Sequence, residues 1–386
     1  MKIKKIVSFL FYPLFFLFSL GQLARVSFYH QQVNGYLYEM MMLVILFLLM
    51  VKYKIKPLTI AFYKNKYIFW FFFYCIMSFF YKIGDFTRLE NYIALLYQAR
   101  LFFYFLSFFY LTYFLKKEKL TSRVFTNALM LFFSITVIIS FIQYFLYKDL
   151  RNLLYLGWDP HLYRIFGSYL DPYVAAAIYG LAFFYLFFKR KNLFNYVLLA
   201  CYFIFIFLTF SRIGYVAFTV TLLLILLKKK WYKTVILTFI LITFLVVIIP
   251  KPQGEGVNLG RIFSVNSRID DYRLAEKIWE KSPLIGIGYN RIRYIKERLN
   301  IFDYKNLAVS HAGASFHSSF IIILVCTGLI GLLVFLKGFI TLFWLTELTR
   351  YVFLYISLFS LADNVLLHPF VLFFTLMLVS LSHKQE

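Results

Sequence analysis

Residues 193–230 read LFNYVLLACYFIFIFLTFSRIGYVAFTVTLLLILLKKK, and this stretch decides the fold class. It holds two apolar runs, 193–210 and 213–227, which only Ser211 and Arg212 separate. Each run is close to the length that crosses the hydrocarbon core of a bilayer as an α-helix. We therefore predict a helical hairpin that spans a membrane, with a very short turn at one face.

The same pattern recurs from end to end of the 386 residues, 62% of which are hydrophobic. The sequence predicts an all-α, polytopic membrane protein of about 12 transmembrane helices. The predicted spans are 6–23, 36–51, 67–81, 92–115, 124–147, 173–188, 193–210, 213–227, 231–249, 316–336, 343–361 and 365–381. Helices 1–9 thus occupy residues 1–250, helices 10–12 occupy residues 316–386, and residues 251–315 form one large hydrophilic loop with short helices.

The formal net charge of +24 bears on topology, because cytoplasmic loops of membrane proteins are enriched in Lys and Arg. Placing both termini in the cytoplasm puts the basic clusters 52–66, 116–123, 189–191 and 228–233 there, and the large loop on the outer face. The basic charge is therefore explained without nucleic acid. The start of the chain resembles a signal peptide, but no small-residue cleavage site follows, so we expect a retained first helix.

Arginine dominates on the predicted outer face, whereas lysine dominates on the inner one. The outer arginines are Arg25, Arg88, Arg151, Arg164, Arg212, Arg261, Arg268, Arg273, Arg291, Arg293 and Arg298. Orienting a helix needs only positive charge, whereas the planar guanidinium can hold a carboxylate or phosphate through two parallel hydrogen bonds. We therefore hypothesise an anionic, phosphorylated ligand on the outer face. The alternative for any one arginine is contact with lipid headgroups.

Two of these arginines stand in informative positions. Arg212 lies at the membrane boundary with no acidic neighbour in sequence, which is a costly place for a charge without a function. In the large loop, residues 267–270 (SRID) fit a capping box, so Arg268 would lie at a helix start, where backbone N–H groups favour anions. That helix would end near residues 281–283, and a second would cover 290–300. A lipid-facing Arg212 and a solvated Arg268 are the alternatives.

Three further titratable residues lie next to or between predicted spans. His317 lies where the large loop meets the apolar run that follows, and histidine can exchange a proton near neutral pH. Asp171 precedes the span 173–188 and can simply cap that helix. Asp363 interrupts the last two spans, and an acid at membrane depth requires a partner or water.

The sequence predicts neither a metal site nor a disulfide. The six histidines include no close metal-ligand pair, and Cys75, Cys201 and Cys326 lie in separate apolar runs. A Walker-type glycine loop, a Gly-x-Ser-x-Gly motif and paired acids on the first outer loop are also absent from the sequence.

An ordered set of motifs occupies residues 164–364. Arg212 follows Thr-Phe-Ser, Ser267-Arg268 precedes KSPLIGIG at 281–288, and His317-Ser-Ser-Phe precedes TGLIG at 327–331. In this order and topology they resemble the family of O-antigen ligases and O-antigen polymerases, whereas the N-terminal spans match in hydropathy alone. The family often has Asn after the histidine and Trp four residues after the loop arginine, where this chain has Ser318 and Tyr272.

The resemblance implies a metal-independent glycosyltransferase with a GT-C-like fold and no cofactor. Members move a glycan from a polyprenyl (undecaprenyl) diphosphate carrier to a glycan or glycolipid acceptor, as in lipopolysaccharide synthesis, on the outer face of the bacterial inner membrane. By this resemblance Arg212 and Arg268 would hold the diphosphate and His317 would be the catalytic base. A base of this kind can be oriented by a carboxylate, and Asp171 and Asp363 are the candidates. The possible supporting residues are Arg164, Asp171, His311 and Asp363.

Three other functions remain open from the sequence. A polysaccharide polymerase of the same family would differ only in its acceptor. A lipid-linked glycan flippase or transporter would use the outer arginines without breaking a bond. A membrane acyltransferase would use an intramembrane histidine such as His368, near Asn364, and would leave the outer arginines unexplained.

Overall fold

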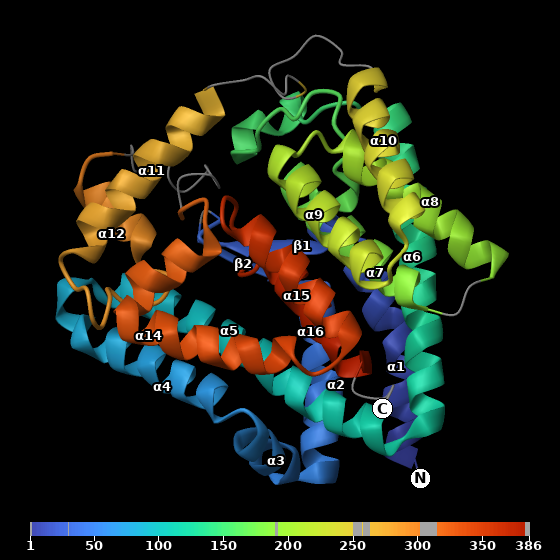
Figure 1. Cartoon of the computed structure of the whole chain (residues 1–386). Coiled ribbons are helices and arrows are strands. Elements are labelled where there is room, and N and C mark those ends of the chain that lie inside the picture. The colour runs from blue at the N-terminus through green and yellow to red at the C-terminus, as the bar shows by residue number, and fades with distance from the viewer. Residues whose placement is uncertain are drawn as a thin grey trace.

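The computed structural model describes residues 2–29, 31–189, 192–249, 257, 263–301 and 315–382. Apart from one short antiparallel hairpin and four 3-10 turns, the elements in these ranges are α-helices (Figure 1). They are α1 (Lys2–Ser19), β1 (Arg25–Phe28), β2 (Val33–Tyr36), α2 (Leu37–Tyr53), α3 (Lys56–Lys64), α4 (Lys66–Tyr81), α5 (Arg88–Lys117), α6 (Lys119–Leu146), α7 (Pro172–Phe188), α8 (Leu193–Leu208), α9 (Arg212–Lys228), α10 (Tyr232–Ile248), α11 (Phe263–Trp279), α12 (Ile292–Arg298), α14 (Ser319–Phe343), α15 (Glu347–Ser360) and α16 (Pro369–Ser382).

Each apolar run identified in the sequence corresponds to one of these helices, which confirms the helical fold class. Among the described residues, α5, α6 and α14 are long and apolar enough to cross a membrane, and α4, α7, α8, α10 and α16 are shorter apolar helices. The sequence did not predict α3, a lysine-rich helix with proline in its first turn, or the β1–β2 hairpin. Hydropathy misses both because neither is a long apolar run.

The helix α7 is deeply buried, because its side chains from Val174 to Leu186 are almost all inaccessible to solvent. Its small residues allow α15 to approach closely, since the Tyr355 hydroxyl donates a hydrogen bond to the Ala176 carbonyl at 2.8 Å. A Cβ atom added to Gly180 would lie only 2.3 Å from the Tyr355 ring. Close approach through small side chains is typical of helix packing in membranes.

The helix α14 is broken at Gly328, which has φ +69° and ψ −176°. The segment after α11 fills the break, because Leu329 N donates to the Pro283 carbonyl at 2.8 Å and Gly288 N to the Cys326 carbonyl at 2.9 Å. Gly286, with φ +80°, lies so close that an added Cβ would sit 2.4 Å from the Cys326 carbonyl carbon. The glycine motifs at 281–288 and 327–331 therefore join the loop to α14 through shared backbone hydrogen bonds.

Ion pairs join the segments that the sequence places on one face. At the end of the molecule that holds α11 and α12, Arg298 pairs with Glu90 at 2.8 Å, so α12 is bound to the start of α5. Elsewhere Lys228 at the end of α9 pairs with Glu347 at 3.6 Å, and Lys4 pairs with Glu118. In Figure 1, α11 and α12 lie at the opposite end of the fold from the N-terminus.

Candidate functional site

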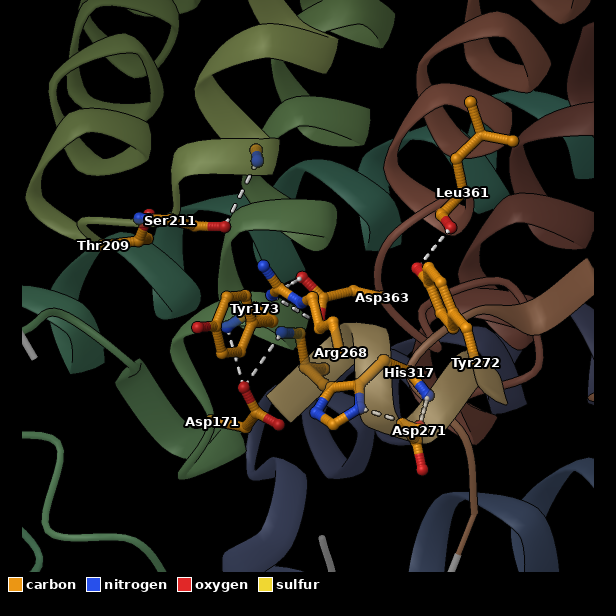
Figure 2. A network of polar contacts seen from close by, with 12 residues as sticks. Asp171, Tyr173, Thr209, Ser211, Arg268, Asp271, Tyr272, His317, Leu361 and Asp363 are labelled. Atoms are coloured by element: carbon orange, nitrogen blue, oxygen red, sulfur yellow. Dashed lines mark hydrogen bonds and ion pairs between the residues drawn. The ribbon is translucent and has the colours of Figure 1, made fainter. Parts of the chain in front are cut away.

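A histidine and a carboxylate meet where α11 packs against the start of α14. The Nδ1 atom of His317 lies 2.9 Å from Asp271 Oδ2, and the same oxygen accepts a hydrogen bond from the His317 backbone N–H at 2.9 Å (Figure 2). The helix α11 supplies Asp271, and the extended residues just before α14 supply His317. The carboxylate thus fixes both the backbone and the ring of the histidine.

The other oxygen of Asp271 is held by Lys296 of α12, whose Nζ atom lies 2.9 Å away and also donates to the Ser315 carbonyl at 2.7 Å. Burial alone would raise the pKa of Asp271, but the hydrogen bonds from His317 and the charge on Lys296 outweigh burial and lower that pKa. The acid is therefore ionised and fully hydrogen-bonded.

An ionised carboxylate at Nδ1 requires a proton on that nitrogen, which leaves Nε2 of neutral His317 with a free lone pair. The side chain of His317 is 35% exposed and lines a cavity of about 340 Å³. The arrangement can therefore accept a proton from a hydroxyl bound in this cavity.

Arg268 lies one turn before Asp271 on α11 and contacts the turn between α15 and α16. Its Nη2 atom is 3.1 Å and 3.3 Å from the two carboxylate oxygens of Asp363. The Arg268 side chain is 16% exposed and that of Asp363 only 8%. A buried acid requires a partner, and for Asp363 this partner is Arg268. Asp363 also lines the cavity that His317 lines.

The predicted helix start at Ser267 is wrong, because α11 begins at Phe263 and runs through Ser267 and Arg268. Nothing in residues 263–266 breaks a helix, so the capping-box pattern is overridden by helix that continues ahead of it. Arg268 thus contributes a side-chain charge from within a helix, and no helix terminus adds to it. The predicted end holds, since α11 stops at Trp279, and α12 covers the core of the predicted 290–300 helix.

Asp171 caps α7, as its place in the sequence allowed. Its Oδ1 atom accepts hydrogen bonds from Tyr173 N at 2.7 Å and Val174 N at 3.4 Å. Asp171 also lines the cavity, but the acid bonded to His317 is Asp271. Neither Asp171 nor Asp363 therefore serves as the orienting acid that the sequence suggested.

Arg164 is buried beside the same cap. Its Nε atom donates to the Thr209 carbonyl at 2.7 Å, and its guanidinium carbon is 5.0 Å from the centre of the Tyr173 ring. The guanidinium carbon of Arg268 lies 6.0 Å from that ring. The Tyr173 ring is thus within cation–π distance of both Arg164 and Arg268, which places Arg164 next to the site.

Arg212 is the first residue of α9 and is half-buried. The turn before it is set by Phe210, with φ +50°, and by Ser211, whose hydroxyl accepts a hydrogen bond from Gly214 N at 3.2 Å. An added Cβ on Gly214 would meet the Phe359 ring at 3.2 Å, so the start of α9 packs on the end of α15. Arg212 therefore lies at the end of α15 that leads into Asp363.

The two departures from the family pattern both have structural partners. Ser318 caps α14 and donates a hydrogen bond from its hydroxyl to the Ser360 carbonyl at 2.9 Å. The Tyr272 hydroxyl donates to the Leu361 carbonyl at 3.0 Å (Figure 2). Both therefore bind α11 and α14 to the end of α15.

Sequence reasoning missed Asp271 and Lys296. The signal for Asp271 was present, since it follows Arg268 by three residues and so shares a face of the same helix. Lys296 had no local signal, because its contact with Asp271 depends on how α12 packs. His311 lies outside the described residues. Within the described ranges, no group of three His, Cys, Asp or Glu side chains is placed to hold a metal ion.

Residues 197–336 match the family model for O-Antigen ligase. The match begins within α8 and ends within α14, so it takes in Arg212, Arg268, Asp271, Lys296 and His317. No curated protein matches the chain. The chain thus has several apolar helices, three of them long enough to cross a membrane, and its residues 197–336 are similar to the O-antigen ligase family.

Proposed function

We propose that the protein transfers a glycan from a polyprenyl diphosphate carrier to a hydroxyl of an acceptor sugar or glycolipid, as an O-antigen ligase does. The observation that carries the proposal is the His317–Asp271 pair, 2.9 Å apart, which opens into a cavity that Asp363, the partner of Arg268, also lines. A base beside fixed cations is what this transfer requires.

In this reaction His317 Nε2 takes the proton from the acceptor hydroxyl as its oxygen attacks the anomeric carbon of the donor glycan. The bond between that carbon and the carrier diphosphate breaks, and the electron pair stays on the diphosphate oxygen. Asp271 holds the imidazole in the reactive tautomer and stabilises the imidazolium that forms. The proton is then released to water.

Arg268 and Arg212 would hold the diphosphate, with Arg164 beside them. Negative charge grows on the leaving oxygen as the glycosidic bond breaks, and fixed guanidinium groups stabilise it. Arg268 is bound to Asp363 at 3.1 Å in the described state. We expect a diphosphate, which carries more negative charge than one carboxylate, to take over part of that contact.

The proposal includes the predicted topology: about 12 spans in a GT-C-like arrangement, both termini in the cytoplasm, and residues 251–315 on the outer face of the bacterial cytoplasmic membrane. The separation between lysine-rich clusters and arginine-rich segments supports this orientation. A cysteine placed at Ser267 should react with an impermeant maleimide in intact cells, and a cysteine at Lys230 should not.

The direct test uses purified protein, a glycan-loaded undecaprenyl diphosphate and a glycolipid acceptor, with release of the carrier diphosphate as the measured quantity. We expect acceptor-dependent release by the wild type and a loss of about 10²–10⁴-fold in His317→Ala. The control is His161→Ala, since His161 is a histidine that lines the same cavity. Equal release by wild type and His317→Ala would exclude His317 as the base.

The same assay separates the alternatives. A polymerase would accept a second lipid-linked glycan in place of the glycolipid, and products would lengthen by whole repeat units. A flippase would release no carrier diphosphate with either acceptor, and would move the lipid-linked glycan across the bilayer regardless of His317.

A further inference from the structure

The cavity that His317 lines also has a group of cations that come from three separate elements. Arg25 of β1, Arg100 of α5 and Arg293 of α12 all line it, and they are called the arginine wall below. Arg25 and Arg100 lie outside the part of the chain that matches the family model. The mechanism proposed above uses none of the three.

Arg100 is a charge within a predicted membrane span, and only part of it is neutralised. Its Nε atom is 2.6 Å from Glu39 Oε1, and its Nη1 atom donates to the Asn34 carbonyl at 3.1 Å. Glu39 is also engaged in capping α2, because its Oε2 atom accepts a hydrogen bond from Tyr36 N at 2.9 Å. The Nη2 atom of Arg100 is buried and has no hydrogen-bond partner among the described residues.

Arg293 joins the same wall through the β1–β2 hairpin and a shared aromatic ring. Its Nη1 atom lies 3.5 Å from the Gln32 carbonyl, which also accepts the Tyr97 hydroxyl at 3.0 Å. The guanidinium carbons of Arg293 and Arg100 each lie 5.9 Å from the centre of the Tyr97 ring. No carboxylate in the described ranges pairs with Arg293, and its buried Nε atom lacks a hydrogen-bond partner there.

A smaller cavity of about 170 Å³ adjoins the first and shares Arg100, Arg293 and His368 with it. No carboxylate lines this smaller cavity among the residues that the structure places. Three acids line the larger cavity: Asp159 and Asp171 interact with Arg164, and Asp363 pairs with Arg268. Within the described residues, the single carboxylate of Glu39 therefore stands against both Arg100 and Arg293, which leaves an excess of positive charge at these two side chains.

We propose that the arginine wall binds an anionic group, a carboxylate or a phosphate, carried by the acceptor saccharide. Buried N–H donors without partners are costly, and a planar oxyanion satisfies two of them at once. The Tyr97 ring and hydroxyl between Arg100 and Arg293 add an aromatic face of the kind that lines sugar-sized pockets. This inference rests on the proposed transfer, because it assigns the arginines beside Asp363 to the donor and the arginine wall that lines the cavity to the acceptor.

The test measures binding without turnover, on the full chain in nanodiscs, by titration calorimetry at low salt. The probes are digalacturonate and glucose 1-phosphate, with galactobiose and glucose as neutral counterparts. We expect each charged probe to bind at least about tenfold more tightly than its neutral counterpart, and Arg293→Gln to remove that preference. Arg273→Gln is the matched control, since Arg273 is 73% exposed and, among the described residues, forms an ion pair with Asp270 one turn earlier on α11.

A second variant guards against misfolding. Arg100→Gln alone leaves Glu39 buried without its cation, so Arg100→Gln/Glu39→Gln removes both charges and keeps the hydrogen-bonding groups. It should fold and should lose the preference as Arg293→Gln does. If only the carboxylate or only the phosphate probe responds, the identity of the anion follows.

Four results would overturn the proposal. In the first two, neither charged probe binds the wild type at millimolar concentration, or the neutral and charged probes bind with equal affinity. In the third, Arg293→Gln leaves the affinities unchanged. In the fourth, inorganic diphosphate competes with the probes, and Arg268→Gln abolishes this competition. The last would assign the probes to the donor site. Because the titration measures binding without turnover, its result can be interpreted even if the transferase reaction fails.

Discussion

Replacing Asp271 by Asn is the sharpest perturbation of the site, because it keeps the shape and removes the charge. Asp271 accepts three hydrogen bonds on two oxygens: two from His317 on Oδ2 and one from Lys296 on Oδ1. An asparagine has one acceptor oxygen and one NH2 donor. On one side of the substituted residue, the NH2 group must therefore face a hydrogen-bond donor, and no hydrogen bond can form there.

If the amide oxygen faces His317, the NH2 group faces the Lys296 ammonium, whose side chain is only 4% exposed and then keeps only the Ser315 carbonyl. We expect this to destabilise the fold by about 1–3 kcal/mol. If the amide is flipped, its NH2 group donates to Nδ1 and moves the proton to Nε2. The base is then lost, and kcat should fall by about 10²–10⁴-fold.

The assay pairs single-turnover release of carrier diphosphate with thermal unfolding of the purified protein. The double variant Asp271→Asn/Lys296→Gln restores a donor–acceptor match at the α12 side, so it should recover stability and a larger share of activity than Asp271→Asn. Asp271→Asn with both wild-type kcat and wild-type thermal stability would refute the assignment of Asp271 as the residue that orients the base.

The stability contributed by Asp271 also depends on pH, with a definite sign. Since its folded-state pKa is lowered, the contribution is fully present above the unfolded-state pKa of about 3.9. It is lost as the pH falls below that value through the folded-state pKa. Acid unfolding curves of wild type and Asp271→Asn should therefore converge at the acid end and separate toward neutral pH.

Three further predictions concern other parts of the site and its frame. Gly328→Ala should destabilise the protein by about 3 kcal/mol or more in thermal unfolding, because its φ and ψ suit only glycine and an added Cβ would lie 2.2 Å from the Leu284 carbonyl carbon. Gly84→Ala is the control, since an added Cβ there meets nothing within 4 Å, and equal melting of the two variants would contradict the packing argument. Arg268→Lys should raise the KM for the carrier-linked donor about tenfold or more, because lysine lacks the bidentate fork; an unchanged donor KM would remove Arg268 from the diphosphate site. Tyr272→Phe should cost about 1 kcal/mol of stability by loss of its hydrogen bond to Leu361 and leave kcat within a fewfold, and a large drop in kcat would show a direct role.

The helices could be predicted because a membrane-spanning segment must satisfy its own backbone hydrogen bonds. An apolar run of the right length has one stable solution, and hydropathy alone finds it. The β1–β2 hairpin and α3 lie outside such runs. They are stabilised by packing against the rest of the fold, so no periodic pattern in the sequence predicts them.

The site divides in the same way. His317 stands at a loop-to-helix boundary that the sequence marks, and Arg268 was singled out although its predicted helix start was wrong. The pairing of His317 with Asp271 depends instead on how α11 packs on α14. One signal was overlooked: Arg100 and Glu39 are ionisable residues inside predicted spans, and such residues are expected to find each other. That pairing could have been predicted from the sequence and would have pointed to the arginine wall.

The glycine joint between residues 283–288 and α14 has a mechanical consequence. A break in a helix usually lets its two halves bend, but here both sides of the break are hydrogen-bonded to the segment that follows α11. Asp271 ties α11 to α14 at a second point, next to His317. Because α11 and α14 are held together at two points, we expect them to move as one rigid unit and to keep the distance between His317 and Asp271 constant while substrates enter and leave. We therefore expect any opening of the cavity to come from parts that α11 meets through side chains, such as the turn at residues 361–364, which Tyr272 and Arg268 join to α11.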